Sequence, residues 1–390
     1  MNATNENSRE LPNSPFRGPG GGPAPPSGGG GGIIIAGGGT GGHIFPAIAI
    51  AGALKQQSPD IELLFVGAKG KMEMEKVPQA GYKIEGIDIA GLNRSSLIKN
   101  IGLPFKLLKS FFQVSRILRT FRPAAVVGVG GYSSFPVLRA AQAKGIPTFI
   151  HESNSFAGKA NQWLGKKATG IFVASDGMEK FFPAEKIRIT GNPVRKNISG
   201  SKIGREEAIR FFGLDPAKQT ILCTGGSLGA KGINEAVAAG LDEFGNNGLQ
   251  LIWQTGKPFA EKAAALCAGR KNSWTRDFIT QMEYAFAAAD IVISRSGAMS
   301  IAELCVAKKA VVFVPFPFAA EDHQTANAQN LVDKAAGLLV KDNEAKEKLV
   351  ATVIALSKDV NKQNELKGNI GKLAVMNADE VIAREVLKSV

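Results

Sequence analysis

The sequence predicts an α/β protein of two Rossmann-like domains, whose parallel, doubly wound sheets face a central cleft. Three observations carry the two-domain plan. Short apolar segments alternate with helical segments along the chain, which is typical of parallel sheets. An apolar run leads into a glycine turn twice, at 33–43 and again at 220–232. With 390 residues the chain exceeds the usual size of one domain, and a ligand is expected in the cleft between two.

The first half opens with a strand, a glycine turn and a helix. The apolar run 33–36 precedes six residues, Gly37 to Gly42, that include five glycines, then His43 and a helix expected at 45–57. Such a turn presents unpaired backbone N–H groups at a helix N-terminus, which suits an anion or a sugar diphosphate. The alternative is a tight strand-to-helix turn that His43 merely caps, and the turn alone does not decide between the two.

Further strands of the first half are expected at 62–66, 124–129, 148–150, 170–174 and 186–190, with a helix at 136–144. Two turns after these strands are rich in functional residue types. Gly130, Gly131 and Tyr132 follow one strand and are candidates for holding part of an acceptor. His151 opens a polar run after another, where open sheets place ligand contacts. A structural role for that run, capping the next helix, is equally consistent with the residues.

The second half repeats the plan, with strands expected at 220–224, 249–254, 291–294, 310–314 and 337–340 and a helix beginning near 233. We expect a disordered Gly/Pro-rich arm at 1–32, an N-terminal domain at 33–195 and a C-terminal domain at 196–368. A C-terminal helix at 369–390 is expected to pack back on the N-terminal domain. The Gly-Asn-Pro segment from 191 and the polar stretch to about 206 indicate the linker.

Two constellations of the second half indicate a ligand. Glu303 follows the turn at 294–297 and is placed to receive two hydroxyls of a ribose, unless it is only a glutamate favoured by a helix dipole in the first turns. The run from 315 to 328 contains His323, Gln324 and Asn327, and few core reasons exist for so many donors and acceptors.

Composition describes an ordinary globular protein, with 44% apolar and 21% charged residues and no stretch long enough to span a bilayer. The three cysteines, Cys223, Cys267 and Cys305, lack paired spacing and are expected to be reduced core residues. The N-terminal arm does not have the pattern of a signal peptide. These features favour the cytoplasm.

The net charge of +13 is concentrated, because no Asp or Glu lies between Asp88 and Glu152. Within that window a helix at 104–119 interleaves apolar and basic residues: Phe105, Lys106, Leu108, Lys109, Phe112 and Arg116. The pattern indicates a basic amphipathic helix for an anionic membrane surface. The alternative is a surface helix whose apolar stripe packs on the core. A nucleic-acid site is disfavoured, because no stacking or recognition-helix pattern is present.

Taken in order, these motifs resemble those of the MurG family of bacterial glycosyltransferases. The likeness runs from about 33 to 387 and rests on the motifs at 37–43, 130–132, 151–154, 191–195, 225–230, 294–303 and 323–327. The family adds N-acetylglucosamine from UDP-N-acetylglucosamine to the muramyl pentapeptide of lipid I, giving lipid II for peptidoglycan. The resemblance implies the GT-B architecture, with the sugar nucleotide mainly on the C-terminal domain and the lipid acceptor mainly on the N-terminal one.

The resemblance also implies residue roles. His43 is the favoured general base, Glu303 binds the ribose, the backbone of Ile279 reads the uracil edge, and Arg195 and Ser227 hold the diphosphate. Further substrate contacts fall to Thr40, Gly41, Gly42, Asn154, His323 and Gln324, and the acceptor or phosphate loop to Gly130, Gly131 and Tyr132. The stretch 92–112 becomes the membrane patch. Ser153 and His323 stand where some relatives have glutamine, which leaves the contacts of Asn154 and Gln324 less certain.

This chemistry suits the residues. A neutral imidazole can take the proton of an acceptor hydroxyl, and donors near the diphosphate stabilise the leaving group. A single displacement inverts the anomeric centre. No Asp-X-Asp motif occurs, so no carboxylate-bridged metal is required, and no cofactor is expected. Expected partners are the two substrates, an anionic membrane surface and cell-wall synthesis and division proteins, with the protein peripheral on the cytoplasmic face of the inner membrane.

Rival functions fit less well. An NAD-dependent dehydrogenase needs an acidic residue at the end of the second strand, where the chain reads Gly67, Ala68, Lys69. A UDP-N-acetylglucosamine epimerase gives no reason for the basic amphipathic segment, but is the closest enzymatic alternative. A membrane-surface subunit that only binds the nucleotide sugar is the non-enzymatic one.

Overall fold

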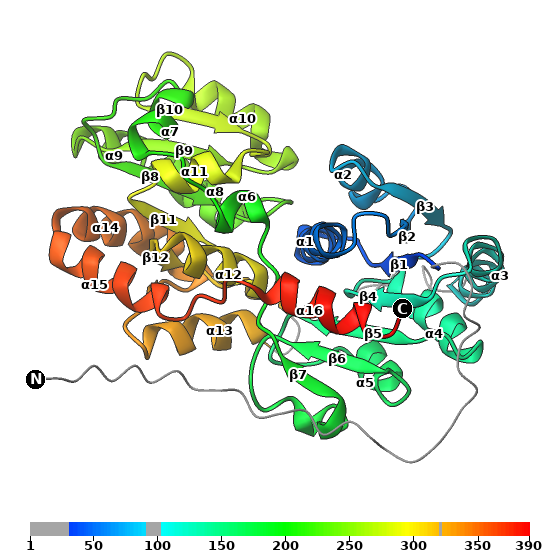
Figure 1. Cartoon of the computed structure of the whole chain (residues 1–390). Helices are drawn as coiled ribbons and strands as arrows, with labels where there is room; N and C mark the ends of the chain where they lie inside the picture. Colours follow the sequence, from blue (N-terminus) through cyan, green and yellow to red (C-terminus); the bar gives the residue numbers. More distant parts are fainter. Residues whose placement is uncertain (1–30, 91–102, 320–321) are drawn as a thin grey trace, which may run out of the picture. The chain divides into compact units, whose positions relative to one another are not determined.

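The computed structural model describes residues 31–90, 103–319 and 322–390. They contain two sheets in which every strand pairing is parallel (Figure 1). The N-terminal lobe holds a seven-stranded sheet in the order β3-β2-β1-β4-β5-β6-β7. Its strands are β1 (Ile33–Ala36), β2 (Leu63–Ala68), β3 (Lys83–Ile87), β4 (Ala125–Gly128), β5 (Thr148–Glu152), β6 (Gly170–Val173) and β7 (Ile187–Ile189).

The C-terminal lobe holds a six-stranded sheet in the order β10-β9-β8-β11-β12-β13. Its strands are β8 (Thr220–Thr224), β9 (Gln250–Gln254), β10 (Ser273–Arg276), β11 (Ile291–Ser294), β12 (Ala310–Phe313) and β13 (Leu338–Leu339). The two-sheet, doubly wound fold that the sequence predicts is therefore confirmed.

Helices cover both faces of each sheet. In the N-terminal lobe, α1 (Gly41–Gln57) and α2 (Glu73–Gln79) pack on one face, and α3 (Leu103–Phe121), α4 (Ser134–Ala143) and α5 (Lys159–Gly165) on the other. The C-terminal lobe has α6 (Lys196–Ser199), α7 (Arg205–Phe211), α8 (Lys231–Ala239), α9 (Leu241–Asn246), α10 (Lys257–Cys267), α11 (Met282–Ala288), α12 (Ala298–Ala307), α13 (His323–Val332), α14 (Ala345–Lys358) and α15 (Val360–Gly371).

The central strands are buried on both faces, which is why they read as continuous apolar runs. Along β1, Ile33 and Ile35 enter the core beneath α1, whereas Ile34 enters the core beneath α3 and α4. All three are 0% exposed. Burial of each such side chain stabilises the fold by about 1.5–3 kcal/mol.

Two strands, β3 and β10, were not predicted from the sequence. Both lie at sheet edges. Polar residues interrupt their apolar ones, and every residue except Ile87 is at least partly exposed. An edge strand has one unpaired side and tolerates such residues, so it lacks the apolar signal of a central strand.

The last helix, α16 (Ala378–Leu387), packs against α1. Its residues Ile382, Ala383 and Val386 are buried in the same core as Ile33 and Ile35. The chain therefore completes the N-terminal lobe with its own C-terminus, after folding the C-terminal lobe in between (Figure 1).

Helix α3 has two kinds of surface. Val114, Ile117 and Leu118 are buried in the core, as the core-packing alternative expected. Phe105 and Phe112 are 76% and 71% exposed, as a membrane-facing helix would have them. The core-packing interpretation is therefore confirmed for one face of the helix, while contact of the exposed face with a membrane stays a prediction.

Residues 1–30 of the predicted arm (1–32) and residues 92–102 of the predicted membrane patch (92–112) lie outside the described residues. The three cysteines are free and buried, as predicted. No helix in the described part of the chain is long and apolar enough to cross a membrane.

Candidate active site

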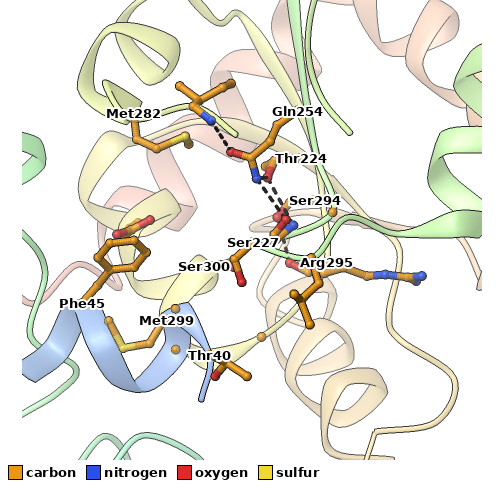
Figure 2. Close-up of a pocket in the computed structure, with 18 of the residues that line it drawn as sticks. Thr40, Phe45, Thr224, Ser227, Gln254, Met282, Ser294, Arg295, Met299 and Ser300 are labelled. Carbon is orange, nitrogen blue, oxygen red and sulfur yellow. Dashed lines mark hydrogen bonds between the residues drawn. The ribbon is translucent and has the colours of Figure 1, made fainter. Parts of the chain in front are cut away.

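A cavity of about 420 Å³ lies between the start of α1 and the carboxyl ends of the C-terminal strands. Most residues predicted to bind substrate line it: Thr40, Gly41, Gly42, Arg195, Ser227, Ile279, Glu303 and Gln324. Figure 2 shows Thr40 and Phe45 on the α1 side, opposite Ser227, Thr224 and Gln254. The structure thus joins the first glycine turn to the second, although Gly42 and Gly225 are 183 residues apart in the sequence.

The first glycine turn is less open than its sequence predicts. The N–H of Gly37 donates to the Val66 carbonyl, that of Gly38 to the Gly130 carbonyl, and that of Gly39 to the Glu73 carboxylate. These three N–H groups hold the turn in place and cannot also bind an anion, so the expectation of a bare turn is wrong for its first half. The N-terminal end of α1, from Gly41, faces the cavity instead.

His43 lies in the first turn of α1, partly buried beside the cavity-lining Gly42. Its Nδ1 lies 3.1 Å from the Gly38 carbonyl, which can only accept, so Nδ1 carries the proton and Nε2 is the basic nitrogen. Burial lowers the pKa of His43 below its usual 6.5. The imidazole is therefore neutral near pH 7, as a general base must be.

The Gly130–Gly131 turn packs directly on this region. A Cβ on Gly130 would lie 2.6 Å from the His43 ring, and one on Gly131 would lie 2.2 Å from the Gly38 carbonyl oxygen. Both glycines have positive φ, +95° and +87°. The turn that the sequence assigns to an acceptor thus also fixes the histidine, while the neighbouring Tyr132 is 51% exposed.

His151 and Glu152 belong to strand β5, not to the turn in which the sequence placed them. His151 is 1% exposed, and neither ring nitrogen has a partner of good hydrogen-bond geometry, although Gly191 and Asn192 lie nearby. Burial lowers the pKa of His151 to about 4. The prediction that the polar run contacts a ligand is therefore wrong for His151 itself, because the strand continues through this residue and its side chain lies in the interior.

Glu152 organises the loop after β5. Its carboxylate accepts hydrogen bonds from Asn154 through both backbone and side chain, from the Gly158 N–H and from the Asn161 amide. Helix α5 begins only at Lys159, with Gly158 at its N-cap, so the alternative that Ser153 or Asn154 caps it is wrong. Asn154 is partly buried and held towards Glu152.

Arg195 and Glu303 are paired with each other. Nε and Nη2 of Arg195 each lie 3.1 Å from Oε1 of Glu303, and both side chains are largely buried. The guanidinium also stacks 4.2 Å above the ring of Phe45, a cavity residue that the sequence did not indicate. Glu303 lies in the second turn of α12, where its carboxylate is held by Arg195.

Gln254 is a further cavity residue that sequence reasoning missed. Its amide donates to Thr224 Oγ1 and the Gly226 carbonyl, and its Oε1 accepts the N–H of Ile279 at 2.9 Å (Figure 2). The backbone N–H of Ile279 is thus already engaged. The available signal was a polar residue at the end of the apolar strand β9.

The donors and acceptors near α13 largely satisfy one another. Gln324 accepts the N–H of Phe316 with its side chain and the hydroxyl of Ser296 with its carbonyl, and Asn327 donates to the Ser296 carbonyl. His323 is the first residue of α13 and is partly buried. Much of this polar run therefore has a structural use, which the sequence interpretation underestimated.

Arg295 points away from the cavity centre (Figure 2). It donates to the carbonyls of Val314 and Pro315 and pairs with Asp342 at 2.6 Å. It thereby supports the loop that carries Phe316 and leads to Gln324.

Known proteins are similar to this chain over most of its length. Residues 33–173 match the glycosyltransferase family 28 N-terminal domain, and residues 220–382 match the glycosyltransferase family 28 C-terminal domain. A relative from Phocaeicola vulgatus, named "UDP-N-acetylglucosamine--N-acetylmuramyl-(pentapeptide) pyrophosphoryl-undecaprenol N-acetylglucosamine transferase", is 52% identical over 90% of this chain and 94% of its own. A relative of the same name from Cytophaga hutchinsonii is 48% identical over 90% of this chain and 94% of its own.

Among solved structures, Acinetobacter baumannii MurG is 31% identical, with a TM-score of 0.68 over 91% of this chain and 99% of that one. A UDP-GlcNAc 2-epimerase from Neisseria meningitidis has a TM-score of 0.64 over 91% of this chain and 99% of that one, but only 14% identity, which indicates a shared fold alone. The chain therefore belongs to glycosyltransferase family 28 and is an enzyme with the two-domain GT-B fold.

Proposed function

We propose that this enzyme transfers N-acetylglucosamine from UDP-N-acetylglucosamine to the muramyl pentapeptide carried on undecaprenyl diphosphate, giving lipid II with inversion at the anomeric carbon. One observation carries the proposal. A single cavity is lined by the glycine turn beside His43 from one lobe and by Ser227 and Glu303 from the other. The close relatives named for this reaction support the choice of substrates.

The donor would occupy the C-terminal side of the cavity. Glu303 would accept the ribose hydroxyls, while Arg195 and Ser227 would hold the diphosphate. Because Arg195 and Glu303 are paired, binding of UDP would exchange this ion pair for contacts with phosphate and ribose. The Ile279 carbonyl, not its engaged N–H, would face the uracil edge. Gln324, with His323 beside it, would contact the transferred sugar.

The reaction would begin at His43. Nε2 would take the proton of the acceptor hydroxyl as its oxygen attacks C1 of the sugar and the bond from C1 to UDP breaks. Negative charge then grows on the diphosphate, where Arg195 and the N-terminal end of α1 would stabilise it. The Gly130–Gly131 turn, Tyr132 and Asn154 would hold the acceptor. We propose no cofactor beyond the two substrates.

We further propose that the enzyme docks on the anionic cytoplasmic face of the inner membrane through the exposed face of α3. Phe105, Leu108 and Phe112 are exposed beside Lys106 and Arg116. Apolar insertion and attraction to anionic lipid would add. Lys109 contributes less positive charge to this face, because it pairs with Asp88 at 3.0 Å.

The test is transfer of labelled sugar from UDP-N-acetylglucosamine to a soluble lipid-linked muramyl-pentapeptide analogue. We expect acceptor-dependent formation of a β-linked disaccharide together with UDP. Conversion of the donor at C2 without acceptor would instead identify an epimerase. Binding of UDP without turnover would leave only a nucleotide-sugar-binding subunit. Either of these results refutes the proposal.

A further inference from the structure

Glu73 is a buried carboxylate that neither the sequence motifs nor the proposed mechanism uses. It is the first residue of α2 and is 1% exposed. No cation lies within 4.0 Å of it among the described side chains. Its two oxygens instead accept two backbone N–H groups, Oε2 from Gly39 at 2.8 Å and Oε1 from Ala68 at 2.9 Å. A buried carboxylate without a cation is costly, so its placement calls for an explanation.

The explanation lies in one peptide group of the glycine turn. The Gly39 N–H that donates to Glu73 and the Gly38 carbonyl that accepts from His43 Nδ1 belong to the same amide. Because an amide is planar and trans, its N–H and C=O point in opposite directions. Glu73 and His43 are therefore joined through the two edges of a single peptide, and hydrogen bonds in such a chain strengthen one another.

The packing leaves this peptide little freedom. A Cβ on Gly38 would lie 2.2 Å from Glu73 Cδ, and one on Gly131 would lie 2.2 Å from the Gly38 carbonyl oxygen. The Glu73 carboxylate packs against one side of the Gly38–Gly39 peptide, and the Gly130–Gly131 turn packs against the other side. The direction of the Gly38 carbonyl, and with it the orientation of the imidazole, is set from both sides.

We propose that Glu73 is a positioning residue for His43: acting through the Gly38–Gly39 peptide, it keeps the imidazole proton on Nδ1 and leaves Nε2 unprotonated towards the acceptor hydroxyl. This rests on the proposed role of His43 as the base. When Nε2 takes the acceptor proton, the Nδ1 proton stays in place. The new positive charge is then stabilised through the peptide by the carboxylate.

Among the described residues, the ionisable side chains that act electrostatically on His43 are Glu73 from α2, and Glu152 and His151 from β5. Burial lowers the pKa of His43, while the negative charges of Glu152 and Glu73 raise it. Removal of the Glu73 charge alone should therefore move the pKa of His43 further down. This movement reports the charge of Glu73, whereas the tautomer of the His43 imidazole reports its positioning role.

The experiment is nitrogen NMR of the intact enzyme labelled in histidine, because ring nitrogen shifts distinguish the two tautomers. The chain has only three histidines, so His43→Ala assigns the relevant signals. In the wild type above the pKa, we expect His43 to be protonated on Nδ1. In Glu73→Gln, one side-chain atom becomes an amide nitrogen that cannot accept, so we expect a mixture of tautomers.

The same variant is then assayed for transfer across pH. We expect kcat to fall roughly 10- to 100-fold, the range found when the outer hydrogen-bond partner of a metal-binding histidine is removed. The acidic limb of kcat/KM should shift to lower pH. Glu73→Asp, which keeps the charge, should retain the limb of the wild type. The matched control is Glu75→Gln, an exposed carboxylate on the same helix, which should change none of these quantities.

Several results would overturn the proposal. A His43 protonated on Nε2 in the wild type contradicts it without any variant. So does a folded, UDP-binding Glu73→Gln enzyme with the wild-type tautomer, or one whose kcat falls while the acidic limb stays fixed. If His43→Ala transferred sugar at the normal rate, the base role would fail, yet the tautomer measurement would still decide whether Glu73 sets the imidazole.

Discussion

Gly131 should be replaceable by alanine only at the expense of both stability and turnover. Its φ of +87° is unfavourable for any residue with a Cβ, and an alanine Cβ would lie 2.2 Å from the Gly38 carbonyl oxygen. That oxygen accepts the hydrogen bond from His43 Nδ1. The added methyl group must therefore displace the Gly38 carbonyl oxygen that orients His43.

The size of the effect follows from two contributions. A left-handed backbone costs an alanine about 1–2 kcal/mol. Overpacking against backbone that is itself held by neighbours costs about 1–3 kcal/mol more. We expect Gly131→Ala to lower the free energy of unfolding by the sum, about 2–5 kcal/mol. Displacement of a catalytic group by about 1 Å typically costs roughly 100-fold in rate, and we expect a loss of that order in kcat.

Gly145→Ala is the matched control. Gly145 has a φ of +72° but no atom within 4 Å of its ideal Cβ, so it shows the backbone contribution without the collision. Thermal or urea unfolding and steady-state transfer should be measured for both variants. The reasoning is refuted if Gly131→Ala is as stable as Gly145→Ala and turns over like the wild type.

Three further outcomes are expected. Glu303→Gln should weaken UDP binding roughly 10- to 150-fold, because a hydrogen bond to a charged group contributes about 1.5–3 kcal/mol. Unchanged UDP affinity in calorimetry would show that the ribose is bound elsewhere. Replacing both Phe105 and Phe112 by serine should reduce binding to anionic vesicles at unchanged melting temperature, whereas Val114→Ser on the same helix should lower the melting temperature. Vesicle binding by the double variant equal to that of the wild type would contradict the docking proposal. Burial lowers the pKa of His151 to about 4, so the unfolded chain binds a proton at this histidine more readily than the folded chain does. This contribution to stability is complete above about pH 6.5 and is lost as the pH falls towards 4, and urea unfolding at several pH values should show the decline. A decline that is undiminished in His151→Leu would contradict this assignment.

The sequence was most informative about features that depend on the residues of a single strand or turn. Continuous apolar runs predict central strands such as β1 and β8, because both faces of a parallel sheet are covered. Ordered glycine turns after those strands place Ser227 and the residues beside His43 at the same edge. The edge strands β3 and β10 have no comparable continuous apolar run, because an edge strand pairs on one side only and tolerates polar residues.

What the sequence could not supply are relations between distant residues. Arg195 and Glu303 are separated by 108 residues, and their pairing depends on the path of the linker. Glu73 belongs to no motif, and only the structure shows that its carboxylate accepts a hydrogen bond from the Gly39 N–H. His151 was misplaced because a polar residue after an apolar run reads as a turn, whereas the strand continues through it into the interior.

The central claim is that His43 removes the acceptor proton in a cavity where UDP is held by other residues. The most direct measurement is single-turnover transfer by His43→Ala beside its affinity for UDP. The account predicts a transfer rate reduced by at least roughly 100-fold, as for loss of a general base, with UDP affinity within about twofold of the wild type. Transfer at the wild-type rate would contradict it.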